Sequence, residues 1–259
     1  MRHDLLSVLT DMGVPTDALR TLPEIASDAE SLLLYGSQAR GDAVPGSDVD
    51  LLAVVPSPRP AVYAGDVNVS YYTTKQLTSG IGTLFGFHLK RDARIMWDES
   101  GSLHSSLNAM GEVDTARLLV RAHKMSQLFT NGAWDLPKYL LGLLREARYL
   151  LRSCMYAQSI AEGAPCFSIR ELGKRHDDPQ LVTLLSSRPT KSETLSDYED
   201  CLRRLRGIIG EFPASPHGSL EATIVNEWGT KDDVLSMAFM ALGATGAGAG
   251  YAEVEKILL

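Results

Sequence analysis

Cysteine is scarce in this chain of 259 residues: it contains three, Cys154, Cys166 and Cys201, and no two of them form a Cys-x-x-Cys pair. Thiols so few and so scattered exclude a disulfide framework and a cysteine-based zinc site, so we expect reduced thiols in a cytoplasmic protein. Long apolar runs are also missing. No window approaches the roughly 18 uninterrupted apolar residues of a spanning helix, and the charged N-terminus lacks the apolar core of a signal peptide.

The chain also lacks an excess of positive charge. Lys and Arg number 25 against 32 Asp and Glu, which gives a formal net charge of −7. This balance argues against a protein that grips an extended nucleic acid through its whole surface, although it allows a local basic cleft. A cationic or neutral small molecule fits the charge better as a partner.

The first 110 residues predict a small domain with a mixed sheet. The first 29 predict one or two short helices, and residues 74–89 have helical spacing. Short apolar runs separated by Gly, Pro and Asp clusters predict strands. The predicted strands are residues 31–35, 49–55, 67–72 and 94–97.

The remaining residues, 111–259, predict an α-helical bundle. Residues 138–160 carry the clearest helical stripe, on which Leu140, Leu144, Ala147, Leu151 and Cys154 fall. A Gly/Ala-rich run at 243–250 predicts a flexible break before a short last helix. The other predicted helices are 115–129, 168–174, 196–209 and 231–242. The fold class is therefore α+β, with a sheet domain at 1–110 and a helical domain at 111–259.

Chemistry concentrates in residues 34–52, Leu-Tyr-Gly-Ser-Gln-Ala-Arg-Gly-Asp-Ala-Val-Pro-Gly-Ser-Asp-Val-Asp-Leu-Leu. Gly36 has no side chain, so a backbone or a phosphate can approach it closely. Ser37 begins a helical turn, where its hydroxyl and the neighbouring amide N–H groups can face an anion. Asp48 and Asp50 open the next strand and point to the same face, roughly 7 Å apart. Two carboxylates so placed repel one another unless a cation lies between them, and oxygen-only donors suit Mg²⁺.

This string, Gly-Ser, ten residues, then Asp-x-Asp, resembles the nucleotidyltransferase superfamily typified by DNA polymerase beta. The relevant subset includes aminoglycoside and lincosamide nucleotidyltransferases and the nucleotidyltransferases of toxin–antitoxin pairs. The resemblance covers residues 30 to 98. It implies transfer of a nucleoside monophosphate, most simply AMP from ATP, to an acceptor hydroxyl, with Mg²⁺ as cofactor.

The resemblance also assigns roles to residues at matching positions. Gly36 and Ser37 would hold the β- and γ-phosphates of a nucleoside triphosphate (NTP), and Asp48 and Asp50 would bind Mg²⁺. Arg40 is a candidate ligand of the triphosphate, and a structural salt bridge is its alternative role. Ser47 joins the nucleotide-binding candidates, although, like Asp42, it suits a turn or cap better.

The third carboxylate that this superfamily usually supplies from the next strand is missing. Asn68 stands at that position, and an amide cannot act as a general base. Three interpretations stay open: Asp66 takes the role, Glu146 of the helical domain takes it, or the site binds nucleotide and turns over slowly or not at all. Glu146 is predicted at the edge of its helix's apolar stripe, and a solvated glutamate is the simpler interpretation.

The acceptor is the least determined partner. We expect a small, aminoglycoside-like molecule in a cleft between the two domains, where ligand sites concentrate, and no membrane. A protein side chain or a tRNA end is the alternative acceptor, and a nucleotide-binding module without turnover is the alternative function. A basic stripe at Arg145, Arg148 and Arg152 is interpreted as a solvated face or as the lining of such a cleft. Trp134 and Trp228 are predicted to pack in a core or between domains.

Overall fold

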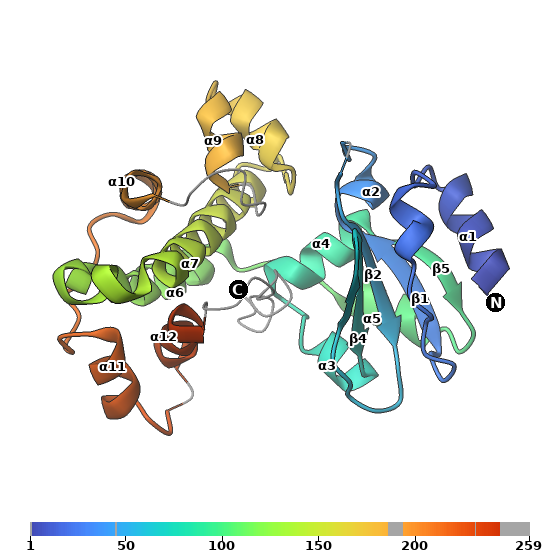
Figure 1. Ribbon diagram of the computed structural model, residues 1–259, viewed down its shortest axis with the longest axis horizontal. Coiled ribbons are helices and arrows are strands. Elements are labelled where there is room, and N and C mark those ends of the chain that lie inside the picture. The colour runs from blue at the N-terminus through green and yellow to red at the C-terminus, as the bar shows by residue number, and fades with distance from the viewer. Residues whose placement is uncertain (1, 45, 186–193, 231, 244–259) are drawn as a thin grey trace. The chain divides into compact units, whose positions relative to one another are not determined.

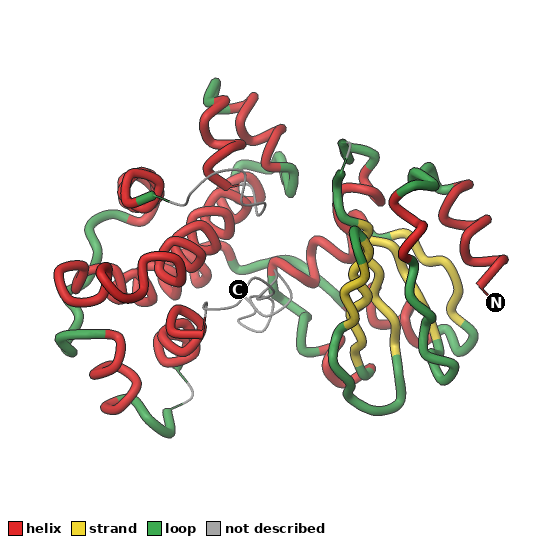
Figure 2. The backbone as a smooth tube through the Cα atoms, viewed as in Figure 1, coloured by secondary structure: helices red, strands yellow, loops and turns green. Residues whose placement is uncertain are grey.

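The computed structural model describes residues 2–44, 46–185, 194–230 and 232–243, and the chain divides into two compact units, 1–112 and 113–259. The strands all lie in the first unit, whereas the second consists of helices and loops among the described residues (Figure 2). This arrangement confirms the predicted α+β class, with a mixed sheet followed by helices. The predicted run 243–250, beyond Gly243, and the last helix after it lie outside the described residues.

The first unit contains a five-stranded sheet. Its strands in chain order are β1 (Ser31–Tyr35), β2 (Val49–Val54), β3 (Val62–Ala64), β4 (Val67–Tyr72) and β5 (Arg94–Asp98). Their order in the sheet is β3-β4-β2-β1-β5, with β2 and β4 parallel and the other neighbours antiparallel (Figure 1). Four of these strands were predicted. The short edge strand β3, whose residues 62 and 63 are exposed, was not.

Helices cover both faces of this sheet. On one face lie α1 (Arg2–Asp11) and the 3-10 helix η1 (Ala18–Thr21), and on the other lie α3 (Thr74–Thr78), α4 (Leu84–Asp92) and α5 (Ser102–Ala109) (Figure 1). Successive side chains of a strand point to opposite faces. Leu51 and Ala53 therefore join the α1 core, whereas Leu52 and Val54 join the core beneath α3–α5.

The single helix predicted at 74–89 is wrong: it is broken into α3 and α4. Thr83 caps α4 by accepting a hydrogen bond from the Gly86 amide at 3.1 Å, and its own hydroxyl donates to the Gly80 carbonyl at 2.7 Å. Two glycines, Gly80 and Gly82, lie in the break, and Gly82 has a positive φ of 78°. The capping threonine and these glycines outweigh the apolar spacing that suggested continuity.

The second unit is organised around α7 (Gly132–Ala161), a helix of 30 residues. It packs against α6 (Thr115–Met125), α10 (Leu195–Ile209) and α12 (Asp233–Gly243). The remaining helices are η2 (Ser126–Asn131), α8 (Ile169–Arg175), α9 (Pro179–Leu185) and α11 (Leu220–Asn226). The predicted stripe of α7 is confirmed at Leu144, Ala147, Leu151 and Cys154, which are all fully buried, whereas Leu140 is half-buried. None of the helices in the described part combines the length and apolarity needed to cross a bilayer.

The predicted helix at 138–160 is present, and a short helix that begins at Gly132 and contains Pro137 precedes it. The two helices meet at a kink, where Tyr139 has a non-helical backbone (φ −125°). The expected core position of two tryptophans is wrong. Trp134 and Trp228 are 73% and 72% exposed, so they do not pack in a core. Trp228 instead lies edge to face with the ring of Phe239, whose centroid is 5.7 Å away.

Candidate functional site

The candidate site is centred on Asp50, which lies in a middle strand of the sheet. Its register partners are Tyr35 on the antiparallel β1 and Asn68 on the parallel β4. Asp50 has the same strand parity as Leu52 and Val54, and Asn68 the same parity as Tyr72, so Asp50 and Asn68 share the face that carries α3–α5. Asp48 precedes β2 by one residue. Because β2 pairs with both β1 and β4, the residues that follow β1 and Asn68 of β4 both lie close to the carboxylate of Asp50.

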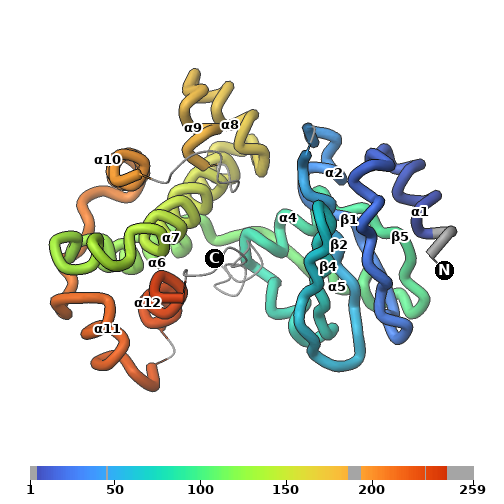
Figure 3. The backbone as a smooth tube through the Cα atoms, in the orientation of Figure 1, coloured from blue at the N-terminus to red at the C-terminus, as the bar shows by residue number. Residues whose placement is uncertain are grey.

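Gly36 is held against the carboxylate of Asp50. It follows Tyr35 directly, opens the short helix α2 (Gly36–Arg40) and adopts a positive φ of 76°. A Cβ placed on Gly36 would lie 2.6 Å from the Asp50 Oδ2 atom, which is closer than real Cβ contacts allow. Both the backbone conformation and the close approach require glycine at this position. In Figure 3 the tube of β1 continues directly into α2 at one end of the sheet.

Burial governs the charge of Asp50. It raises the pKa of this carboxyl to about 6; the hydrogen bond from Asn68 opposes the shift, and the charge of Asp48 adds to it. Arg40 acts in the same direction as Asn68, but more weakly. A raised pKa means that the groups of the protein itself do not compensate the negative charge at this position.

Asn68 occupies the register position opposite Asp50 and binds it directly. Its Nδ2 atom donates a hydrogen bond to Asp50 Oδ1 at 3.1 Å. Asp66, the other candidate from this part of the chain, lies exposed in the turn before β4, and its carbonyl oxygen accepts a hydrogen bond from the Val49 amide at 2.7 Å. The structure therefore places Asn68, and not Asp66, beside Asp50.

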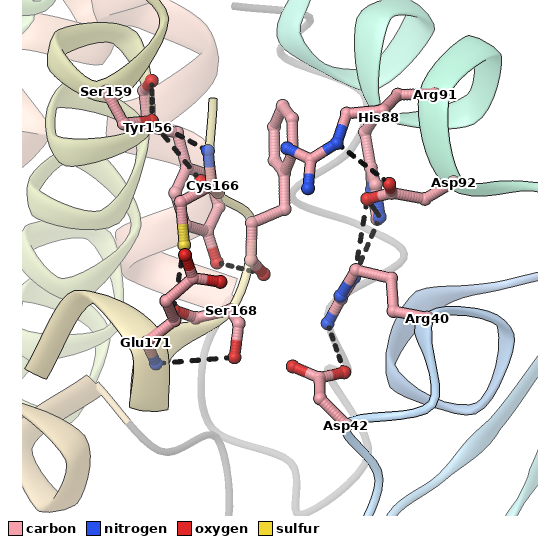
Figure 4. A network of polar contacts seen from close by, with 11 residues as sticks. Arg40, Asp42, His88, Arg91, Asp92, Tyr156, Ser159, Cys166, Ser168 and Glu171 are labelled. Atoms are coloured by element: carbon pink, nitrogen blue, oxygen red, sulfur yellow. Dashed lines mark hydrogen bonds and ion pairs between the residues drawn. The ribbon is translucent and has the colours of Figure 1, made fainter. Parts of the chain in front are cut away.

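Arg40 lies within a network of ionic and polar contacts (Figure 4). Its Nη2 atom is 3.2 Å from Asp42 Oδ1, and its Nη1 atom is 2.9 Å from His88 Nε2 and 3.9 Å from Asp92 Oδ2. Asp92 also forms an ion pair with Arg91, whose Nε atom lies 3.0 Å from Asp92 Oδ1. These contacts tie the end of α2 to α4 and agree with the structural role weighed for Arg40.

Ser37 lies in the first turn of α2, and Ser47 lies near the end of the loop between α2 and β2. The Ser37 carbonyl accepts the amides of Gly41 and Asp42 at 3.0 and 3.2 Å, which closes the helical turn. The Ser47 hydroxyl accepts the Val44 amide at 2.8 Å, as expected of a turn residue. Ser37 thus lies next to Gly36 in the site, whereas the Ser47 hydroxyl is engaged within its own turn.

Glu146 is fully buried in the described structure, which overturns the solvated alternative. Arg145 donates from Nε to Glu146 Oε1 at 2.8 Å, and Glu146 Oε2 has no hydrogen-bond partner. Burial raises the pKa of this carboxyl to about 7, against the opposing charge of Arg145. Burial therefore favours the neutral form of this carboxyl.

The predicted basic stripe on the same helix is not a solvated face. Arg145 donates from Nη2 to the Met240 carbonyl, and Arg152 donates from Nη2 to the Leu185 carbonyl at 3.1 Å. Arg152 is buried. These guanidinium groups bind carbonyl groups near the ends of α12 and α9, so they serve packing within the helical unit.

Asp48 and Asp50 fit a divalent cation. They supply oxygen donors, the charge of the half-buried Asp50 is not compensated, and Gly36 keeps the space beside Asp50 Oδ2 free of a side chain. Over the described ranges of the chain, no three His, Cys, Asp or Glu side chains are grouped so that they could hold a metal ion. The two aspartates would therefore have to share a cation with oxygens of the substrate, which is typical of Mg²⁺.

Sequence reasoning missed His88 and Asp92 as the partners of Arg40. The only local signal was the spacing of His88 and Asp92, four residues apart on one helical face, where their side chains lie 3.4 Å apart. The 48 residues that separate Arg40 from His88 carry no signal of that contact.

Comparison with known proteins adds one finding. Residues 18–96 match the family described as the nucleotidyltransferase domain, which belongs to the DNA polymerase beta-like superfamily. The match includes β1 to β4 and the residues Gly36, Ser37, Asp48, Asp50 and Asn68. No curated protein matches the chain. The N-terminal unit therefore contains a nucleotidyltransferase domain, as the Gly-Ser and Asp-x-Asp string indicated.

Proposed function

We propose that this protein transfers a nucleoside monophosphate, most simply AMP from ATP, to the hydroxyl of an acceptor, and that Asp48 and Asp50 hold the Mg²⁺ ion required. The observation that carries this proposal is the contact geometry of Gly36 and Asp50. A glycine with positive φ follows β1 and is packed against a half-buried carboxylate in a nucleotidyltransferase domain. The triphosphate of a nucleotide has to approach the backbone closely, which a glycine allows, and it needs a cation nearby to neutralise its charge.

The proposed reaction is a substitution at the α-phosphorus. The acceptor oxygen forms a bond to this phosphorus, the bond from the α-phosphorus to the oxygen that bridges it to the β-phosphorus breaks, and pyrophosphate leaves. Gly36 and Ser37 hold the β- and γ-phosphates. The cation, when bound, neutralises the charge that develops on the phosphate oxygens.

The proton of the acceptor hydroxyl has to pass to a base, and we propose Asp66 as the first candidate. Its side chain is exposed in the turn before β4, two residues before Asn68, although Asn68 and not Asp66 lies beside Asp50. Glu146 is the second candidate, because its raised pKa suits a proton acceptor near neutral pH. Full burial and the contact with Arg145 count against it.

For the acceptor we propose a small cationic or neutral molecule, such as an aminoglycoside-like compound, since the chain carries a formal charge of −7. A protein side chain or a tRNA end is the alternative to be tested. We also propose a cytoplasmic location, because Cys154, Cys166 and Cys201 are all buried free thiols, as expected in a reducing compartment.

A second candidate function is a nucleotide-binding module without turnover. The hydrogen bond from Asn68 to Asp50 favours it, because an amide at this position cannot accept a proton. This module would keep the affinity for nucleotide and would lack transfer to any acceptor.

A transfer assay separates the two functions. Each of the four NTPs, labelled at the α-phosphate, is incubated with Mg²⁺ and a panel of aminoglycosides, tRNA and proteins, including the chain itself. Label on an acceptor that disappears in Asp50→Ala supports the enzyme. Nucleotide binding without labelled product supports the module, and absence of both binding and transfer contradicts the proposed function.

A further inference from the structure

His88 contacts both ends of the short segment that the proposed site uses. Its Nε2 atom lies 2.9 Å from Nη1 of Arg40, the last residue of α2. Its ring also lies edge to face with Tyr35, the residue directly before Gly36, with centroids 6.4 Å apart. One side chain on α4 thus touches residues immediately before Gly36 and immediately before Gly41.

The contact with Arg40 fixes the protonation of the ring. A guanidinium group can only donate hydrogen bonds, so His88 Nε2 has to accept, and the ring proton resides on Nδ1. Burial lowers the pKa of His88 to about 3, and the positive charges of Arg40 and Arg91 add to the shift. His88 is therefore a neutral acceptor, and its ring does not repel Arg40.

The neighbours of His88 complete the anchor. Asp92 lies one helical turn further along α4 and within 3.9 Å of Arg40, while Asp42 binds the other terminal nitrogen of the guanidinium group. Phe85, one turn before His88, packs edge to face on Tyr35, with ring centroids 6.3 Å apart. α4 therefore holds the segment from Tyr35 to Asp42 from one side, and that segment holds Gly36 against Asp50.

We propose that His88 is a positioning residue for nucleotide binding: as a neutral acceptor it fixes Arg40 and braces Tyr35, and so holds the Gly36–Gly41 segment in the conformation that receives the phosphates. This inference rests on the proposed function. His88 itself touches no reacting atom. Loss of the brace weakens nucleotide binding while the carboxylates of the site stay in place.

The test compares His88→Leu, which removes the acceptor, with His88→Gln, whose side-chain oxygen can still accept from Arg40. His104→Leu is the matched control, because His104 is an exposed histidine of α5 in the same unit. Calorimetric titration with a non-hydrolysable ATP analogue and Mg²⁺ gives Kd, and the transfer assay gives KM and kcat. Hydrogen exchange of the Gly41 and Asp42 amides, which bond to the Ser37 carbonyl, reports on the segment itself.

We expect His88→Leu to raise Kd and KM at least about tenfold, the size of one lost hydrogen bond to a charged group, with kcat nearly unchanged. It should also speed exchange at Gly41 and Asp42, whereas His88→Gln and His104→Leu stay close to wild type. A folded His88→Leu protein with wild-type Kd and exchange overturns the inference. Should His88→Leu not fold, His88→Asn replaces it, since its shorter side chain does not extend to the Nε2 position.

The two proposals fail separately. A wild-type protein that binds no nucleotide contradicts the proposed function. In that case, the hydrogen-exchange rates alone test whether His88 holds the Gly36–Gly41 segment in place. Faster exchange in His88→Leu supports it, and unchanged exchange overturns it. Wild-type binding that is equally strong in His88→Leu contradicts only the role of His88.

Discussion

Asn68 donates a hydrogen bond from Nδ2 to Oδ1 of Asp50 at 3.1 Å, across the parallel pair of β2 and β4. This bond stabilises the charged form of a carboxylate whose burial favours the neutral form. It also occupies one of the two oxygens of Asp50 and leaves Oδ2 facing Gly36. The site thus has two carboxylates and one amide where three carboxylates would repel one another.

Asn68→Asp should make the metal-free protein less stable and its response to Mg²⁺ larger. A third acid beside Asp50 adds like-charge repulsion of about 1–2 kcal/mol, which a bound cation relieves. Thermal unfolding with EDTA and with Mg²⁺ measures both effects, and Asn108→Asp at an exposed position of α5 is the control. Equal melting temperatures for Asn68→Asp and wild type under both conditions would show that position 68 does not face the site.

The same variant also tests the catalytic base. A faster transfer by Asn68→Asp would identify an impaired catalytic site, and an unchanged rate would place the base elsewhere.

Asp50→Asn should abolish transfer and stabilise the metal-free protein. At pH 8 the wild type buries a charge that the folded state disfavours, because the pKa of Asp50 is raised to about 6. The amide removes this cost, which is on the order of 1–2 kcal/mol after allowance for partial contact with solvent. Urea unfolding in EDTA at pH 8 measures the gain. A less stable Asp50→Asn protein would mean that Asp50 is compensated by groups of the fold and does not await a cation.

Gly36→Ala should cost more than Gly41→Ala, although both glycines have nearly the same positive φ, 76° and 78°. An alanine at either position carries the backbone strain, about 1–2 kcal/mol. Only at position 36 does the new Cβ also collide with Asp50 Oδ2, since nothing lies within 4 Å of a Cβ on Gly41. Urea unfolding and nucleotide titration of both variants check this difference, and equal losses would contradict the contact between Gly36 and Asp50.

Glu146→Gln should stabilise the protein at high pH and leave it nearly unchanged at low pH. The pKa of Glu146 rises from 4.5 to about 7 on folding, so the folded state retains a proton that the unfolded state loses. Stability of the wild type therefore falls as pH rises from about 4.5 to 7, by on the order of 3 kcal/mol. A glutamine side chain does not titrate, so the stability of Glu146→Gln does not fall over this pH range.

Unfolding of Glu146→Gln at pH 5 and pH 8 provides the measurement, with Glu162→Gln at the exposed end of α7 as the control. A stability gain in Glu146→Gln that is the same at both pH values would exclude a buried, neutralised carboxyl.

The sequence carried strong signals for elements that bury apolar side chains at a regular period. β1, β2, β4 and the stripe of α7 were predictable because each buries apolar side chains in a core, and β5 was predictable although its side chains are only half-buried or exposed. β3 was missed because two of its three residues are exposed. The break between α3 and α4 depends on the Thr83 cap, a local hydrogen bond that apolar periodicity does not encode.

The candidate site was predictable in part. Strand parity predicted that Asp48 and Asp50 point to one face, and the family resemblance predicted Asn68 at the position of the third carboxylate. The hydrogen bond from Asn68 to Asp50 and the close approach of Gly36 to Asp50 are known only from the structure. The contact of Arg40 with His88 and the complete burial of Glu146 arise from tertiary packing between helices, which spacing along one helix does not determine. The exposed Trp134 and Trp228 show the converse, since a large aromatic side chain is not by itself evidence of a core position.

The central claim is that Asp48 and Asp50 hold a divalent cation that carries the triphosphate of a nucleotide against Gly36. Calorimetric titration of a non-hydrolysable ATP analogue into wild type and into Asp48→Asn/Asp50→Asn, each with Mg²⁺ and with EDTA, tests it most directly. Binding to wild type should require Mg²⁺ and should be lost in the double variant. Binding of equal affinity in EDTA, or in the folded double variant, would contradict it.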